Sequence, residues 1–343
     1  MNEKRTDINE LGEFALIDTL TKKFTSYHNE TIKGVGDDAA VISISEKEAL
    51  LISTDTLIEG IHFDLQYTPL KHLGYKAVTV NLSDIYAMNG NPQQITVSIA
   101  ISNRFSVEAI EEIYEGIKKA CDWYEIDLIG GDTSSSTSGL ILTITAIGRV
   151  EKNRIAFRST AKENDLLVVS GDLGAAYLGL QLLEREKQIF NENPDLQPDL
   201  DGYDYLLERQ LKPEARKDII AQLYAFDIIP TSMIDISDGL ASEIMHLCQS
   251  SQLGCNVYED KIPLDPKTCT TALDFNISPV TAAMNGGEDY ELLFSVRQSD
   301  YEKLITIKEL QVIGHFTAKD NGIYLIDKQN QIFPIKAQGW KHF

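Results

Sequence analysis

The stretch 74-GYKAVTVNLSDIYAMNG-90 predicts a helix with two apolar sides, and the rest of the chain is best understood outward from it. At three- and four-residue spacing, one face of this helix carries Leu73, Ala77, Val80, Asp84 and Ala87. A second apolar stripe consists of Val78, Leu82 and Ile85. Such a helix is largely buried, and an ionised aspartate on it is costly unless it is paired or binds a metal. Asp84 is therefore either a metal ligand or a structural residue that caps a helix or accepts backbone N–H groups.

Segments typical of strands and helices alternate on both sides of this helix. In the first part of the chain, strands are predicted over 39–44, 49–58, 94–101, 126–133 and 139–150. The strand over 126–133 is expected to run into a glycine turn. Helices are predicted over 10–27 and 106–124, and Ser106 suits the N-cap of the second.

A second alternating unit follows from residue 165. A strand, a turn and a helix are predicted over 165–183 and again over 231–251, a helix over 213–224, and strands at the end of 280–296 and over 321–326. The acidic segment 190–205 is expected to be an exposed insertion. This alternation is typical of an α/β or α+β protein. We expect two domains, 1–150 and 151–343, because 343 residues suit two domains of ordinary size.

The composition argues against several kinds of partner. A formal net charge of −21 disfavours nucleic acid, which requires clustered Lys and Arg, and also an anionic membrane surface. No apolar run approaches the roughly 20 residues that are needed to span a bilayer. The cysteines have no metal-ligand spacing, so we expect reduced thiols in a cytoplasmic protein; they are Cys121, Cys248, Cys255 and Cys269.

Several carboxylates lie in turns of small residues at the ends of apolar strands. They are Asp37 and Asp38 in 34-GVGDDAAV-41, Asp55 in 52-ISTDTLIEGIHF-63, Asp132 in 128-LIGGDTSSS-136, Asp235 and Asp238 in 234-IDISDGL-240, and Glu288 and Asp289 in 285-NGGEDYELLF-294. Taken singly, each is explained as well by turn chemistry or by a helix N-cap. As a set, in both halves and with few basic residues nearby to compensate them, they indicate a cation site; for Asp37 and Asp38, nothing nearby in the sequence is basic enough to pair with them.

The residues beside these carboxylates favour magnesium. Ser53, Thr54, Thr133 and Ser237 accompany them, and an oxygen-only ligand set suits Mg²⁺ rather than zinc. Magnesium on several carboxylates is typical of a phosphate-bearing substrate. The familiar phosphate-binding motifs are absent from the sequence: there is no P-loop, no Rossmann fingerprint and no protein-kinase motif set. The segment 170-SGDLGAAYLG-179 starts a helix, which would either bind a phosphate or only pack closely on a strand.

Together, these motifs resemble the thiamine-monophosphate kinase family. The matching stretches are GVGDDAAV, STDTLIEGIHF, GYKAVTVNLSDIYAMNG, LIGGDTSSS, IDISDGL, NGGEDYELLF and the ending 339-GWKHF-343. They occur in the family order over nearly the whole chain. The resemblance implies that ATP and Mg²⁺ are used to phosphorylate thiamine monophosphate to thiamine diphosphate, the last step in making that cofactor.

The resemblance also implies roles for individual residues. Several Mg²⁺ ions would be bound by Asp38, Ser53, Thr54, Asp55, Asp84, Asp132, Asp235 and Asp238, among which Asp55, Asp84, Asp132 and Asp235 would be catalytic. ATP would contact Tyr114, Gly131, Asp132, Arg158 and Ser237. Thiamine monophosphate would contact His62, Glu288 and Trp340. Asp37 would orient Asp38, and Lys341 stands where the family commonly has an aspartate.

The family fold sets expectations for architecture and mechanism. It implies an aminoimidazole ribonucleotide synthetase-like fold, with an N-terminal domain that pairs with its twin through a shared β-barrel and a C-terminal α+β domain. ATP between subunits or domains implies a homodimer. We expect direct in-line transfer, since the acceptor is already an anionic phosphate oxygen.

Other activities are less well matched. A selenophosphate synthetase would carry a reactive cysteine in an N-terminal glycine-rich loop, and none precedes Cys121. A hydrogenase-maturation protein would have a C-terminal cysteine, whereas this sequence ends in Phe343. A non-catalytic module that binds divalent metal is the alternative from a different class.

Overall fold

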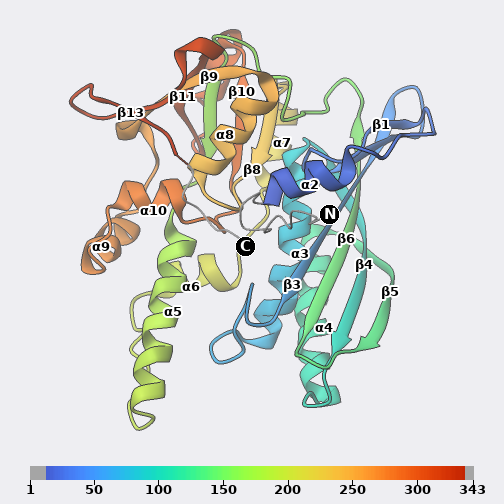
Figure 1. Cartoon of the computed structure of the whole chain (residues 1–343), viewed down its shortest axis with the longest axis vertical. Helices are drawn as coiled ribbons and strands as arrows, with labels where there is room; N and C mark the ends of the chain where they lie inside the picture. The colour runs from blue at the N-terminus through green and yellow to red at the C-terminus, as the bar shows by residue number, and fades with distance from the viewer. Residues whose placement is uncertain (1–12, 337–343) are drawn as a thin grey trace, which may run out of the picture.

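The structure is a computed structural model that describes residues 13–336, and these form two lobes built on separate sheets (Figure 1). Within the described residues, the first lobe holds a six-stranded sheet in the order β1-β2-β3-β6-β4-β5. Its strands are β1 (Thr31–Lys33), β2 (Ala40–Ser43), β3 (Glu48–Ile58), β4 (Asn91–Ile101), β5 (Asp127–Ser135) and β6 (Ile141–Glu151). Only β4 and β5 pair in parallel, and α4 supplies the crossover that a parallel pair requires.

Two long helices cover this sheet, and a shorter one precedes it. They are α3 (Leu70–Ala87), α4 (Val107–Tyr124) and α2 (Glu13–Thr21). α3 packs on β3, β4 and β6, and α4 packs on α3. The two helices approach so closely that a Cβ on Gly74 would lie 2.0 Å from the Ile113 carbonyl oxygen, and one on Gly116 2.0 Å from that of Lys71. Glycine at both positions therefore sets the distance between the helices.

The second lobe holds a sheet that is also mainly antiparallel. Among the described residues it has seven strands in the order β13-β12-β9-β11-β7-β10-β8, and only β12 and β9 pair in parallel. The strands are β7 (Leu166–Ser170), β8 (Ser232–Asp235), β9 (Leu253–Tyr258), β10 (Leu292–Val296), β11 (Leu310–Ala318), β12 (Ile323–Ile326) and β13 (Ile332–Pro334). The expected α/β or α+β class is confirmed as a mixed architecture with two sheets.

The helices of the second lobe lie on and beside its sheet (Figure 1). They are α5 (Ala175–Glu192), α6 (Asp204–Leu211), α7 (Lys217–Ala225), α8 (Leu240–Ser251), α9 (Pro266–Asp274), α10 (Pro279–Asn285) and α11 (Tyr301–Leu304). Short 3-10 turns are η1 (Glu259–Lys261), η2 (Gln298–Asp300) and η3 (Lys319–Asn321). Within 190–205 every residue is exposed except Leu200, Tyr203 and Tyr205, which are half-buried, so the exposure expected for the acidic segment is confirmed.

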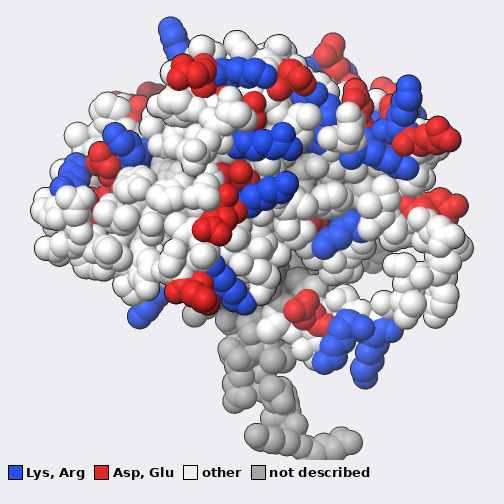
Figure 2. Space-filling model, turned by 90° about the horizontal axis from the view of Figure 1, so that it is seen from above, with Lys and Arg blue, Asp and Glu red and all other residues white. Residues whose placement is uncertain are grey.

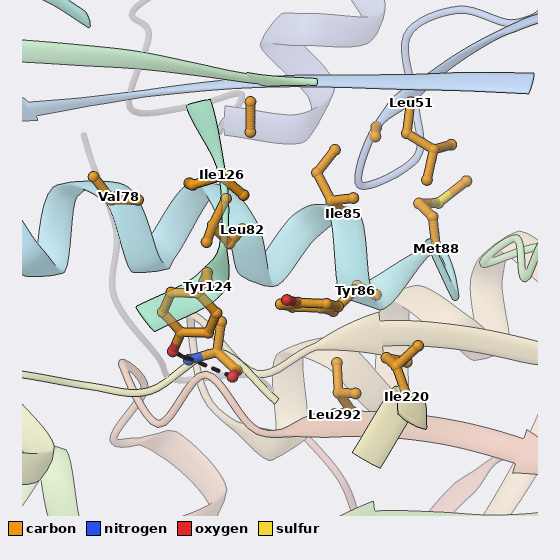
Figure 3. Close-up of a cluster of buried hydrophobic side chains, with 14 of the residues drawn as sticks. Leu51, Val78, Leu82, Ile85, Tyr86, Met88, Tyr124, Ile126, Ile220 and Leu292 are labelled. Carbon is orange, nitrogen blue, oxygen red and sulfur yellow. Dashed lines mark hydrogen bonds between the residues drawn. The ribbon is translucent and has the colours of Figure 1, made fainter. Parts of the chain in front are cut away.

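The two lobes share one continuous apolar core through α3. Ile85 lies on the side of α3 that faces the first sheet and Leu51, whereas Tyr86 lies on the opposite side, toward Ile220 and Leu292 of the second lobe (Figure 3). All five side chains are buried. The predicted two-sided burial of this helix is therefore confirmed, and α3 is the element on which both lobes pack.

Polar contacts reinforce this junction. The hydroxyls of Tyr75 and Tyr124 each donate to Glu214 Oε2 at 2.7 Å, and the main-chain N–H of Ala215 donates to the Tyr124 hydroxyl at 2.8 Å. Figure 3 shows Tyr124, with a dashed hydrogen bond at its hydroxyl, beside the core. These hydrogen bonds hold residues 214–215 of the second lobe against both helices of the first.

Some local predictions are confirmed and others are wrong. α4 begins after Ser106, whose hydroxyl accepts from Ala109 N–H at 3.3 Å, as the N-cap prediction required. The glycine turn expected after the strand at 126–133 is wrong, because β5 continues to Ser135. A Cβ on Gly131 would lie 1.8 Å from the Val97 carbonyl oxygen, so this glycine permits the close approach of β4. The helix expected from residue 213 begins only at Lys217.

The first sheet is open within the described part of one chain. β1 and β5 form its edges, and no strand pairing closes it into a barrel among residues 13–336. The barrel expected from two chains therefore remains a prediction.

Charges of both signs are mixed on the face of the molecule that is seen from above (Figure 2). The face seen from above the second lobe carries acidic and basic side chains interspersed, with neither sign forming a continuous field (Figure 2). Within residues 13–336, no helix is both long and apolar enough to cross a membrane.

Candidate active site

Three aspartates from three separate elements converge at the junction of the lobes. Asp38 lies in the turn before β2, Asp84 in the last turn of α3, and Asp235 at the end of β8. Each offers a carboxylate oxygen, and these oxygens all lie within 4.8 Å of one another. We call these three residues the aspartate cluster. The structure thus brings together three of the eight predicted metal ligands, from segments that are far apart in the sequence.

Burial and mutual repulsion dominate the electrostatics of the aspartate cluster. Burial raises the pKa of Asp84 well above its ordinary value, and the negative charges of Asp55, Asp235 and Asp38 raise it further. Burial and then the charge of Asp38 raise the pKa of Asp235 to about 7. A bound cation would relieve this repulsion. A buried set of carboxylate oxygens without nitrogen or sulfur ligands fits Mg²⁺.

Hydroxyl and amide groups hold these carboxylates in place. Ser53 on β3 donates a hydrogen bond to Asp84, and Ser83 Oγ on α3 donates to Asp235 Oδ2 at 2.5 Å. Asn81 Oδ1 accepts from the Asp55 main-chain N–H at 2.9 Å. The NLSD motif of α3 therefore supplies one cluster carboxylate and two of the side chains that organise its neighbours.

Asp38 has a basic partner that the sequence did not reveal. Arg158 binds both oxygens of Asp38, with Nη2 at 2.7 Å from Oδ1 and Nε at 3.0 Å from Oδ2, across 120 residues of sequence. The main-chain N–H of Arg158 donates to Asp37 Oδ1 at 3.2 Å, and Lys33 Nζ lies 3.9 Å from Asp37 Oδ2. The interpretation that this aspartate pair lacks a basic partner is therefore wrong. Asp37 orients the Arg158 backbone and through it the partner of Asp38.

The structure separates Asp132 and Gly131 from the aspartate cluster within one chain. Asp55 on β3 pairs with Ile144 on β6, Ile144 pairs with Val97 on β4, and Val97 pairs with Gly131 on β5. Three strand spacings correspond to about 14 Å. Asp132 is exposed on this edge strand. The metal and ATP roles of these two residues stay predictions.

Tyr114 and Thr54 also lie away from the cluster. Tyr114 is half-buried against the core on α4, next to Ile113, which contacts Gly74 on α3. Gly74 precedes Asp84 by ten residues, which is about 15 Å along a helix axis. The Thr54 hydroxyl is exposed and lies 2.9 Å from the Thr145 hydroxyl on β6. Their expected contacts with ATP and metal stay predictions.

The segment 285–291 lies on the turn that follows Asp235. The main-chain N–H of Glu288 donates to the Ser237 carbonyl at 2.7 Å, and that of Tyr290 to the Ile236 carbonyl at 2.9 Å. Glu288 and Tyr290 have φ values of 59° and 51°. A non-glycine residue at positive φ is strained, and such strain is concentrated at functional sites. The strained segment thus contains one expected ligand contact, Glu288, and adjoins another, Ser237.

Glu288 is held by two residues that sequence reasoning missed. Lys76 Nζ lies 3.0 Å from Glu288 Oε1, and Gln210 Nε2 donates to Glu288 Oε2 at 2.6 Å. The charge of Glu288 also raises the pKa of Tyr67, after burial and the carboxylates of Glu184 and Asp64. Tyr67 follows His62 in one loop, and its hydroxyl donates to Glu184 Oε1 at 2.7 Å. A lysine within a helix predicted to be buried was the signal that could have identified Lys76.

His62, Asp238 and Trp340 complete the predicted set. His62 Nδ1 accepts from the Ile58 main-chain N–H at 3.0 Å, and its side chain is half-buried. Asp238 is half-buried, and its main-chain N–H donates to Glu243 Oε1 at 3.0 Å. Trp340 and Lys341 lie outside the described residues. The ligand roles of His62, Asp238 and Trp340 therefore stay predictions.

The helix start in the glycine-rich segment 170–179 is already occupied by a side chain. Asp289 accepts from the main-chain N–H groups of Gly174 at 2.8 Å and Ala176 at 3.4 Å. A Cβ on Gly174 would lie 2.8 Å from the Ala283 nitrogen. The structure therefore shows close packing of this segment, which is one of the two alternatives left open by the sequence.

Beside this segment lies an ion-pair network that no sequence motif indicated. Arg209 and Arg216 both pair with the buried carboxylate of Glu291.

Comparison with known proteins gives concordant matches. Residues 36–150 match the family described as AIR synthase related protein, N-terminal domain. A thiamine-monophosphate kinase of Buchnera aphidicola subsp. Schizaphis graminum is 37% identical over 97% of this chain and 99% of its own length. That of Bacillus subtilis is 32% identical over 97% of this chain and 100% of its own. The structure of AaThiL complexed with AMPPCP and TMP is 30% identical, with a TM-score of 0.84 over 99% of this chain and 100% of that one.

Proposed function

This chain belongs to the thiamine-monophosphate kinase family, and we propose that its aspartate cluster binds Mg²⁺ and aligns two phosphate groups for direct transfer between them. The enzyme is a phosphotransferase that converts thiamine monophosphate to thiamine diphosphate with ATP as co-substrate. What we propose is the role of individual residues: those that would hold the cation, those that would contact each substrate, and those that would complete the site.

The observation that carries the proposal is the convergence of Asp38, Asp84 and Asp235 within 4.8 Å. Asp38 and Asp235 are buried and Asp84 is half-buried, and their carboxylates repel one another, so the site favours a divalent cation. Mg²⁺ bound there would supply positive charge for the phosphate oxygens, which explains how a protein of net charge −21 binds anions. Asp55, whose charge acts on Asp84 and Asp235, and Asp238, which follows Asp235 by three residues, would enlarge the same ligand set.

The residues of the chain would act by position and charge rather than as a base. The acceptor is an anionic phosphate oxygen, so no side chain has to remove a proton from it, and no covalent intermediate is needed. Arg158 would turn its two N–H groups from Asp38 to a phosphate of ATP, because a guanidinium binds carboxylate and phosphate with the same fork. In-line transfer then depends on alignment and on preorganised charge.

The thiamine end of the acceptor would lie between the loop that carries His62 and the segment 285–291. The thiazolium ring is cationic, and the side chain of Glu288 is an anion that is 28% exposed. Trp340 would add an aromatic contact, as the family resemblance implies. These substrate assignments follow the family resemblance, and the charge of Glu288 raises the pKa of Tyr67, which lies in the same loop as His62.

We propose that the enzyme is a homodimer in which β5 contributes to the partner's site. All residues of β5 are exposed, including Leu128 and Ile129, which are large and apolar at 46% and 57% exposure. Gly131 and Asp132 lie on the same strand, about 14 Å from Asp55 by strand spacing. Association of the sheets of two chains would cover this strand and supply Asp132 to a second cluster.

A single assay tests the proposed function against a non-catalytic metal module. The purified protein is incubated with ATP, Mg²⁺ and thiamine monophosphate, and thiamine diphosphate is measured by chromatography. We expect stoichiometric product with Mg²⁺ and none with excess chelator. Magnesium binding without any product would contradict the proposal and favour the module.

A further inference from the structure

Lys76 is a buried cation in the middle of α3. Its side chain is 5% exposed, and its Nζ lies 3.0 Å from the Gln210 carbonyl oxygen and 3.0 Å from Glu288 Oε1. Lysine is almost never buried unless it is paired. Both partners belong to the second lobe, so this side chain connects the helix shared by the lobes to the segment that carries Glu288.

The Glu288 carboxylate is held at both oxygens. Lys76 binds Oε1 and the amide of Gln210 donates to Oε2 at 2.6 Å. The main chain of Glu288 is fixed as well, by its hydrogen bond to the Ser237 carbonyl and by a φ of 59°. Lys76 lies deeper than the carboxylate, which retains 28% exposure. The Glu288 side chain thus remains partly accessible, whereas the lysine that pairs with it is buried.

The same face of α3 also determines where Asp235 lies. Ser83, which donates to Asp235 Oδ2 at 2.5 Å, follows Lys76 by seven residues. Residues seven apart lie on one face of a helix and are separated by about 10 Å along its axis. One rigid helix thus fixes the distance between the residue that holds Glu288 and the residue that holds a cluster aspartate.

We propose that Lys76 is a positioning residue for the acceptor substrate. With Gln210, it holds Glu288 so that the carboxylate meets the cationic thiazolium ring while the phosphate of the same molecule reaches the aspartate cluster. A substrate with a cation at one end and a phosphate at the other would place its cation at Glu288 and its phosphate at the aspartate cluster. This inference rests on the proposed function and adds a residue that acts through Glu288.

The test compares Lys76→Met with Lys76→Arg and a control, Lys71→Met, in the full-length enzyme. Lys71 is on the same helix, but it is exposed and pairs with Glu115. For Lys76→Met we expect a rise of about tenfold in KM for thiamine monophosphate, with KM for ATP and kcat changed less than about twofold. Lys76→Arg keeps the charge and should recover part of the loss. Lys71→Met should match the wild type.

A double-mutant cycle separates positioning from general structural support. If Lys76 acts through Glu288, then Lys76→Met should have little further effect on KM for thiamine monophosphate in a Glu288→Gln background. An equal rise of both KM values, an unchanged KM for thiamine monophosphate, or an undiminished effect in the Glu288→Gln background would each overturn the proposal. Gln210→Met replaces Lys76→Met in the same cycle if the latter does not fold. A wild-type enzyme that makes no thiamine diphosphate would refute the proposed function, whereas an active wild type with an unaffected Lys76→Met variant would refute only this inference.

Discussion

Arg158 is expected to contact both the cation site and the nucleotide. Its guanidinium binds both oxygens of Asp38, which is a member of the aspartate cluster, and Asp37 fixes its main chain. The fork that binds this carboxylate would bind a phosphate equally well. We therefore expect Arg158 to alternate between Asp38 and ATP, so that nucleotide binding frees Asp38 for the cation.

Replacing Arg158 by lysine tests this exchange. Lysine keeps one charge but loses the bidentate contact, so KM for ATP should rise about tenfold while KM for thiamine monophosphate changes little. Steady-state kinetics with each substrate varied in turn measures both values. Arg149→Lys, at an exposed position on β6, is the matched control. Equal KM values for ATP in the wild type and Arg158→Lys would show that Arg158 does not contact the nucleotide.

Asp84→Asn should abolish turnover without unfolding the protein. The substitution keeps the shape of a side chain that Ser53 contacts, but it removes the charge that would bind Mg²⁺, so kcat should fall by about 1000-fold or more. Without metal, the variant should be at least as stable as the wild type, because one of three repelling carboxylates is neutral. Thermal unfolding with and without Mg²⁺ should show stabilisation by the ion in the wild type only. Asp122→Asn, exposed on α4, is the control, and undiminished kinase activity in Asp84→Asn would refute the metal assignment.

At the scale of elements, α3 positions residues at both ends of the candidate site. It packs on the first sheet on one side and on the second lobe on the other (Figure 3). Its polar residues Lys76, Ser83 and Asp84 are directed to Glu288, Asp235 and the cluster. A shift of this helix would displace both Glu288 and the aspartate cluster. Its contacts with α4 therefore matter for the site as well as for stability.

Gly116→Ala tests the close crossing of α4 and α3. The added Cβ would lie 2.0 Å from the Lys71 carbonyl oxygen, so the helices must separate. We expect a loss of about 1–3 kcal/mol in the free energy of unfolding, despite the better helix propensity of alanine. Urea unfolding followed by circular dichroism measures this value. Gly34→Ala has no atom within 4 Å of the new Cβ and should change stability by less than about 0.5 kcal/mol. Equal stability of the two variants would show that the crossing tolerates a side chain at residue 116.

At the scale of the whole molecule, the site in one chain is incomplete by the family pattern. The aspartate cluster lies between the lobes, yet Asp132 is on the exposed edge strand β5. Leu128 and Ile129 on that strand are exposed, and the first sheet is open at this edge. Exposed apolar residues on an unpaired edge favour association. The homodimer proposed above would explain all three features together.

Ile129→Lys tests whether β5 lies in a dimer interface. A charge buried at the interface should convert the wild-type dimer to a monomer, and activity should fall if the site needs both chains. Analytical ultracentrifugation at assay concentration determines the oligomeric state. Ile332→Lys, at an exposed position on β13, should leave the dimer intact. A wild-type monomer, or a variant that remains dimeric and fully active, would contradict the proposed interface.

Mixing two inactive variants tests whether the sites are shared. If Asp132 serves the partner's site, heterodimers of Asp132→Asn and Asp84→Asn contain one site without either substitution. After random reassociation in equal amounts, about a quarter of wild-type activity should return, because half of the dimers are mixed and half of their sites are intact. Each variant alone should stay inactive. No recovery from a mixture that demonstrably contains heterodimers would place Asp132 in the site of its own chain.

The sequence alone determined the local features of this protein. Apolar spacing predicted the two-sided helix, the Ser106 cap and the alternation of strands and helices, because these depend on residues a few positions apart. The acidic motifs marked Asp38, Asp84 and Asp235 as candidate ligands, since oxygen ligands in turns have a recognisable chemistry. Only the tertiary structure decided which charges meet. Arg158 pairs with Asp38 across 120 residues, and Lys76 on α3 meets Glu288 from the other lobe, because tertiary packing and not sequence spacing brings these charges together.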